Sequence, residues 1–347
     1  SCLFLPRVLP DGSRNALFVQ RLKDKLGNKA NASSEAEFRG ATAWLVGDEG
    51  RGVPQILEMG TMTRLDCALG TSGLMRQALS IAMNHTAQRS AFGKRLVEQP
   101  LMRNVLADLA LDAEASVALT MRVARAVDAA ARDPMEAAFA RIATAIGKYW
   151  ICKRCPPFVN EAQECLGGAG YVEESGLPRL YRQAPLNSIW EGSGNIQCLD
   201  VLRALNKEPE TREALFGELM AARGANTDLD REIGWLATAL DDVTTLELRA
   251  RMVVERMALA LQASVLLRAG KIGEVAATKG EVEERPILDD FVSMLGEART
   301  QADAHRMKRP AYADEVAAVI AFLCADESRW INGVNLPVDG GLASTYV

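Results

Sequence analysis

The chain has 347 residues, of which 48% are apolar and 24% are charged, so it can bury a large core in two or three globular units. Its net charge of -5 gives no general attraction to a phosphate backbone, so nucleic acid is not the leading partner. The sequence contains no apolar run of the roughly 20 residues that span a bilayer and no signal-peptide pattern at its start, so we expect a cytoplasmic protein with no membrane partner.

The first fifty residues have the pattern of β-strands. Apolar runs at 3–5, 16–20 and 38–46 are separated by turn sequences around Gly12 and Gly27. Strands this few do not make a stable sheet alone. We therefore interpret residues 1–50 as part of a β-domain that packs on other segments.

From about residue 51 the apolar period becomes helical, as in Leu101, Val105 and Leu109, which recur at every fourth position. The pattern predicts helices over 54–88, 99–131, 135–166, 195–205, 209–223, 228–242 and 246–268. Three helices of about thirty residues with short connections predict an antiparallel bundle, because each must cover the apolar stripe of its neighbour.

The pattern changes again after Gly270. A charged, glycine-containing stretch is followed by helix-like segments at 286–306 and 313–325, and residues 334–341 have the pattern of a strand closed by a turn. The sequence thus predicts a mainly α chain, with a partial β-domain, a helical bundle and, over 271–347, a linker and a short helix-strand tail.

Cysteine and histidine do not indicate a metal site. The seven cysteines are odd in number and irregularly spaced, which favours reduced thiols. Cys152 and Cys155 lack the second pair that a zinc site needs, and the two histidines lie far apart. We expect no metal.

Three short motifs follow one another in the helical region: residues 89–93 (RSAFG), 166–171 (LGGAGY) and 190–195 (WEGSGN). In this order and spacing they resemble the C-terminal domain of the acyl-CoA dehydrogenase family. Residues 21–28, 62–70 and 187–195 resemble the AidB-like branch of that family, which is associated with the response to DNA alkylation. The resemblance covers about residues 1–268.

The resemblance implies a fold and a chemistry. Residues 51–205 would form the four-helix bundle of the family, and residues 206–270 would form an extra AidB-like helical region. The implied cofactor is FAD, the substrate is an acyl-CoA-like thioester, and the chain would form a homo-oligomer, either a dimer or a tetramer. The residues implied to contact FAD are Arg89, Phe92, Gly93, Gln99, Gly167, Gly168, Gly170, Gly192, Ser193 and Asn195, with Gly168 reaching the cofactor of a neighbouring subunit.

The resemblance assigns the catalytic base to Glu191 and the substrate contacts to Arg64, Trp190 and Gly192. Removal of a proton α to a thioester needs a carboxylate on one face of the substrate while the flavin accepts a hydride on the other. Glycines beside Glu191 allow backbone amides to approach a ligand. Plainer readings remain: Glu191 as a carboxylate at a helix start, Arg64 as a solvated helix charge and Trp190 as a core anchor.

The family builds its flavin site with further domains that residues 1–268 do not resemble, so we expect this chain by itself to bind flavin weakly or not at all. From about residue 286 the chain resembles the end of a short-chain dehydrogenase. Two alternatives stay open: a DNA-associated alkylation-response protein and an inactive fusion remnant. Residues 206–270 hold eight Lys or Arg against eleven Asp or Glu, which argues against a basic face there.

Overall fold

The computed structural model describes the backbone of residues 1–278. The short-chain-dehydrogenase-like tail predicted from about residue 286 lies outside the described residues. Within them, no helix is long and apolar enough to cross a membrane.

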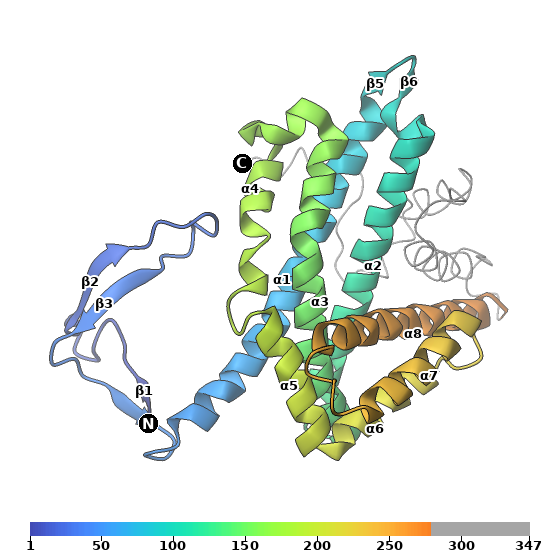
Figure 1. Ribbon diagram of the computed structural model, residues 1–347. Helices are drawn as coiled ribbons and strands as arrows, with labels where there is room; N and C mark the ends of the chain where they lie inside the picture. Colours follow the sequence, from blue (N-terminus) through green and yellow to red (C-terminus); the bar gives the residue numbers. More distant parts are fainter. Residues whose placement is uncertain (279–347) are drawn as a thin grey trace.

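The N-terminal strands form two small antiparallel pairs beside the helices (Figure 1). Strand β1 (Cys2–Phe4) pairs with β4 (Trp44–Val46), and β2 (Leu17–Leu22) pairs with β3 (Ser34–Phe38). The prediction of one strand over 38–46 was wrong, because Gly40, at φ 73°, bends the chain between β3 and β4. Large apolar side chains on these strands stay exposed, so the strands enclose no core within the described chain.

Three long helices form the bundle: α1 (Gly52–Gln88), α2 (Pro100–Ala129) and α3 (Pro134–Leu166). They lie side by side in Figure 1 and pack on one another. The sequence also fixes their starts, since Pro100 and Pro134 occupy first helical positions and Asp133 caps α3 through its side chain. These helices confirm the predicted ones to within two residues at each end.

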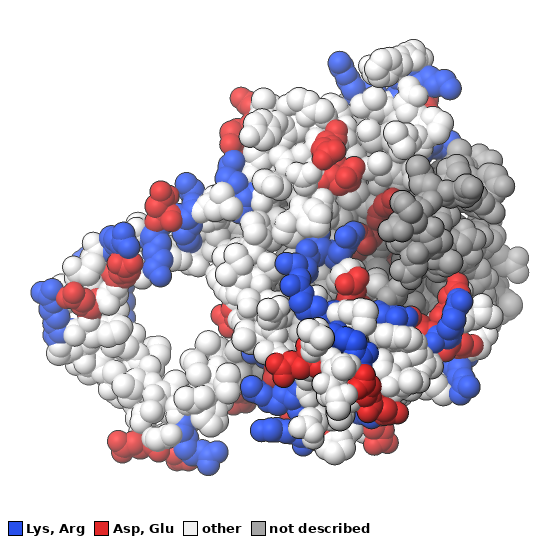
Figure 2. Space-filling model, viewed as in Figure 1, with Lys and Arg blue, Asp and Glu red and all other residues white. Residues whose placement is uncertain are grey.

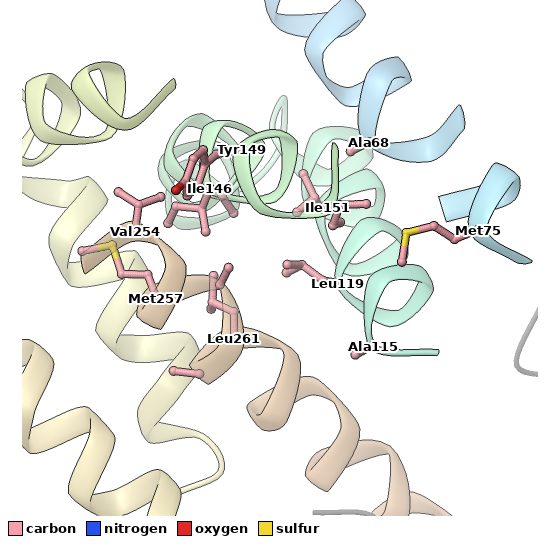
Figure 3. Packing of buried hydrophobic residues seen from close by; sticks show 14 of the residues in the cluster. Ala68, Met75, Ala115, Leu119, Ile146, Tyr149, Ile151, Val254, Met257 and Leu261 are labelled. Atoms are coloured by element: carbon pink, nitrogen blue, oxygen red, sulfur yellow. The ribbon is translucent and has the colours of Figure 1, made fainter. Parts of the chain in front are cut away.

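The second half of the bundle consists of α5 (Gly194–Lys207), α6 (Pro209–Met220), α7 (Thr227–Asp241) and α8 (Ala250–Thr278). In Figure 3, Ile146 and Tyr149 of α3 face Val254 and Met257 of α8. These contacts connect α8 to the core of the bundle. Helix α8 continues past the break predicted at Gly270, because an isolated glycine costs a helix only about 1 kcal/mol.

Short elements that the sequence pattern did not predict complete the described fold. They are β5 (Ser90–Ala91), β6 (Lys94–Arg95), the helix α4 (Leu177–Gln183) and the 3-10 turns η1 (Leu96–Glu98), η2 (Gly167–Tyr171), η3 (Glu173–Ser175) and η4 (Leu186–Ser188). Apart from η3 they lie at or near the motifs quoted above, and they set the geometry of the site.

Candidate functional site

Glu191 lies in a tight turn between η4 and α5. Its φ of 56° is in the left-handed region, and Gly192 follows at φ 94°. A side chain in that region costs about 1–3 kcal/mol, so the conformation persists only where surrounding contacts fix it. The Glu191 side chain is exposed, while its backbone is held from three sides.

The contacts that hold this backbone come from three side chains. Lys148 Nζ donates to the carbonyl oxygens of Trp190, at 2.7 Å, and Gly192, at 2.5 Å. Gln197 Nε2 donates to the carbonyl oxygens of Glu191 and Gly192, each at 3.0 Å, and Arg64 Nε donates to that of Glu191 at 3.2 Å. Three consecutive carbonyls thus face side-chain donors.

Lys148 is an unusual donor because it is only 1% exposed on α3. Burial lowers the pKa of its ammonium below the ordinary value of 10.5. A charged group that deep in a protein is costly unless polar partners compensate it. For Lys148 the partners are the two carbonyls that flank Glu191.

Arg64 is not a solvated helix charge. Its Nη1 donates to Asp200 of α5 at 2.8 Å, and the same carboxylate accepts from Arg141 of α3 at 3.0 and 3.2 Å. Because the Arg64 side chain is 19% exposed and that of Asp200 is 11% exposed, these are largely buried ion pairs. They connect α1, α3 and α5 beneath the Glu191 turn.

Trp190 is fixed through Asn187. The indole Nε1 donates to Asn187 Oδ1 at 2.9 Å, and Asn187 Nδ2 donates to Thr71 Oγ1 of α1 at 2.8 Å. The indole is 38% exposed, so it is held against the bundle with one face accessible, and it is not a fully buried core anchor.

The residues after Glu191 begin helix α5. Ser193 is its N-cap and makes no side-chain capping bond, and Asn195 is exposed in the first turn. The first backbone N–H groups of α5 therefore have no capping side chain and can donate to an anion or a carbonyl oxygen. A Cβ placed on Gly194 would lie 3.4 Å from the Tyr149 ring, which is van der Waals contact, so the backbone at the start of α5 lies close to this ring.

The RSAFG motif forms a two-residue hairpin between β5 and β6. Phe92, at φ 54°, and Gly93, at φ 80°, both take the positive φ values of a type I′ turn. Phe92 is 98% exposed, so the turn projects an aromatic ring into solvent. Arg89 is exposed at the end of α1, and Gln99 Nε2 supports the hairpin by donating to the Ala91 carbonyl at 3.2 Å.

The glycine motif ends α3. Gly167 lies at φ 59°, and both it and Gly168 have open space where a side chain would stand. Gly170 is different, because a Cβ there would collide with the Gln163 carbonyl. Gly167 and Gly168 thus offer open backbone, whereas Gly170 is required by packing.

The predicted site residues fall into two groups. Arg64, Trp190, Glu191, Gly192, Ser193 and Asn195 meet around the start of α5, while Arg89, Phe92, Gly93, Gln99, Gly167, Gly168 and Gly170 lie toward the other end of the bundle (Figure 1). About 36 Å of helix separates Arg64 from the end of α1 at Gln88. One copy of the chain therefore does not bring the two groups together.

The sequence patterns assigned no role to five residues that form hydrogen bonds or ion pairs around the Glu191 turn: Lys148, Gln197, Asp200, Asn187 and Arg141. A lysine within the apolar run Ile146 to Ile151 was the one available signal of a buried cation. Asp200, Asn187 and Arg141 depend on contacts between residues far apart in the chain, which a local pattern does not contain. Gln197 contacts Glu191 and Gly192, only six and five residues away, but no short motif assigns a role to it.

Comparison with known proteins identifies the family of the helical region. Residues 50–206 match the family model described as "Acyl-CoA dehydrogenase, C-terminal domain". The chain is 55% identical over 233 residues to the putative acyl-CoA dehydrogenase AidB of Escherichia coli, covering 67% of this chain and 43% of that protein. Caenorhabditis elegans ACDH-11, solved in complex with C11-CoA, superposes with a TM-score of 0.72 at 26% identity, over 86% of this chain and 55% of that one.

The tail matches a different family. Residues 287–343 match the model described as "Enoyl-(Acyl carrier protein) reductase". A segment of 62 residues is 84% identical to the coniferyl-alcohol dehydrogenase of a Pseudomonas strain. This segment makes up 18% of this chain and 24% of that enzyme.

The chain spans less than half the length of the E. coli relative and about half that of the solved C. elegans structure. The family match, the 55% identity and the superposition all fall on the helical bundle or include it. Over residues 50–206, this chain belongs to the acyl-CoA dehydrogenase family.

Proposed function

We propose that this chain supplies the catalytic base and the thioester-binding turn of an FAD-dependent oxidoreductase of the acyl-CoA dehydrogenase type. The Glu191 turn carries the proposal, because a strained glutamate next to a free helix start is held in place by three donors. Such strain is characteristic of functional sites.

The chemistry assigned to Glu191 is proton abstraction. Its carboxylate takes the proton from the α-carbon of an acyl-CoA thioester, and the electrons of that C–H bond enter the new α,β double bond. When bound, FAD supplies the acceptor for the hydride that leaves the β-carbon. The backbone N–H group of Gly192, next to Glu191 and before the start of α5, is the donor that we assign to the thioester carbonyl while the proton moves.

The residues present fit two parts of a flavin dinucleotide, and the two sets of residues lie in separate places on the chain. The free N–H groups at Gly194 and Asn195 suit a pyrophosphate, and the exposed Phe92 ring and open Gly168 backbone suit an aromatic ring system. Because one chain holds these places far apart, we propose a homo-oligomer in which Arg89, Phe92 and Gly168 serve the cofactor of a neighbouring copy.

The proposed substrate class rests on the thioester chemistry of the family and on the solved relative, whose complex contains C11-CoA. A test is to mix the chain with excess FAD and an acyl-CoA without oxygen and to follow the flavin absorbance. The excess of FAD offsets the weak flavin binding expected of this chain alone. Flavin mixed with the parent chain should be bleached by the thioester, and flavin mixed with Glu191→Gln should not. Equal bleaching by both would remove Glu191 from the mechanism.

DNA binding, the alternative from sequence, is less well supported by the charges of the extra helices. Basic and acidic side chains are interspersed over this region in Figure 2. Five of its arginines pair with acids: Arg212 with Asp241, Arg231 with Asp228, Arg249 with Asp242, Arg256 with Glu232 and Arg268 with Glu218. Paired charges attract a phosphate backbone weakly. Salt-dependent binding to a DNA duplex would restore this alternative.

A further inference from the structure

The two hydrogen bonds of Lys148 go to the carbonyls immediately before and after Glu191. Lys148 Nζ therefore connects the Trp190 and Gly192 carbonyl oxygens, so both must stay within hydrogen-bonding distance of this one atom. Gln197 and Arg64 bind the Glu191 carbonyl between them. Among the residues that the structure describes, only Lys148 bonds the carbonyls on both sides of Glu191 without bonding the carbonyl of Glu191 itself.

The location of Lys148 explains why it can impose this conformation. It is on α3, in the buried centre of the bundle, between Gly147 and Tyr149, and its stem is 1% exposed. Helix α3 packs on α1, α5 and α8, so the ammonium is attached to a helix that is surrounded by the bundle. Lys148 thereby ties the position of the turn to the bundle core.

The other charged and titratable groups near the ammonium are Cys67, Cys152, Arg64 and Glu191 itself. Cys67 and Cys152 are buried neutral thiols, since burial raises the pKa of both. Arg64 is engaged by Asp200. The hydrogen bonds of Lys148 are thus made to the turn, where they offset the cost of burying it.

We propose that Lys148 is the positioning residue of Glu191: by bridging the Trp190 and Gly192 carbonyls, it holds Glu191 in the left-handed conformation and so sets the direction of its carboxylate. The catalytic part of this inference rests on the proposed function, whereas the conformational part does not. Lys148 touches neither substrate nor cofactor in this role and acts only through the backbone of Glu191.

The test compares Lys148→Met with the parent chain and with Lys153→Met. Methionine keeps the length and apolar stem of lysine but has no donor. Lys153 is an exposed lysine on the same helix, so Lys153→Met controls for loss of a positive charge from α3. Two readouts are taken: the φ angle of Glu191 in crystal structures of the three proteins, and the rate of α-deuterium exchange into butyryl-CoA in D2O with excess FAD.

Lys148→Met should move Glu191 out of the positive φ region and slow the exchange at saturating thioester by about ten-fold or more, since small misplacement of a catalytic group costs rate. The half-saturating thioester concentration should change by less than about two-fold, because Lys148 does not bind substrate. Lys153→Met should match the parent in both readouts. If Lys148→Met does not fold, Lys148→Gln, which keeps one amide donor group, is measured in its place.

A Lys148→Met chain that keeps Glu191 at a positive φ and exchanges at the parent rate would overturn the proposal. A rise in the half-saturating concentration with an unchanged maximal rate would also overturn it, since that result assigns Lys148 to binding. If the parent itself exchanges no deuterium, the proposed function fails, while the φ angle still decides whether Lys148 holds the turn.

Discussion

Replacing Asp200 by alanine should destabilise the bundle, because this carboxylate is the shared acceptor for Arg64 and Arg141. Removing one partner of a fully buried pair costs about 3–5 kcal/mol. Here Arg141 keeps Glu208 at 3.3 Å and Arg64 keeps the Glu191 carbonyl, and alanine improves the helix propensity of α5. We therefore expect a net loss of about 2 kcal/mol in the free energy of unfolding.

Denaturant unfolding of the parent, Asp200→Ala, Arg64→Ala and the double variant measures this directly. The cycle should give a coupling energy of about 1–2 kcal/mol between Arg64 and Asp200, within the range seen for residues in one ion-pair network. The matched control is Glu173→Ala, which breaks the similarly two-pronged Arg182–Glu173 pair, whose Glu173 side chain is 67% exposed.

Burial is the difference between the two pairs, so the exposed one should contribute little, and added salt should weaken it further. If Glu173→Ala destabilises the chain as much as Asp200→Ala does, burial is not what makes the Asp200 pairs stabilising. Loss of the coupling between Arg64 and Asp200 in moderate salt would lead to the same conclusion, since a largely buried pair is poorly screened.

Two further predictions use the glycines and the thiols. Gly170→Ala should lower the free energy of unfolding by about 2 kcal/mol or more, because the new Cβ meets the Gln163 carbonyl. Gly168→Ala, which has open space at this position, should leave stability unchanged and weaken only FAD binding. Thermal melts measure the first effect and flavin titration measures the second. Burial raises the pKa of Cys152 and Cys155 from 9.0 to about 12, so in native protein at pH 8.5 peptide mapping should find both unalkylated by iodoacetamide. Between pH 9 and 12 the unfolded chain loses these protons and the folded chain keeps them, so stability should fall with rising pH in that window, and a flat profile would contradict their burial.

The sequence predicted the long helices well because their information is local. The apolar period of α1, α2 and α3 and the prolines at two of their starts depend on neighbouring residues alone. The strands were predicted less well, since Gly40 divides a run that has the composition of one strand. Helix α4 has only seven residues, too few to show an apolar period in the sequence, although its Leu177 is fully buried.

The site divides in the same way. Glu191 and the glycines follow from motifs that are contiguous in the chain, so resemblance identified them. Lys148 and Asp200 act through contacts that the fold creates, and the Arg64–Asp200 pair joins residues from α1 and α5. Glu191 could therefore be identified from the sequence, whereas the residues that hold its turn could be identified only from the structure.

The role of Glu191 as the catalytic base is tested most directly by the rate of α-deuterium exchange into an acyl-CoA. The parent chain and Glu191→Gln are compared, with FAD in excess. Glutamine keeps the volume and the backbone contacts of the turn but cannot accept the proton. If Glu191 is the base, the parent exchanges deuterium and Glu191→Gln is slower by about 100-fold or more, the usual contribution of a general base. Equal rates in the two proteins would contradict this role.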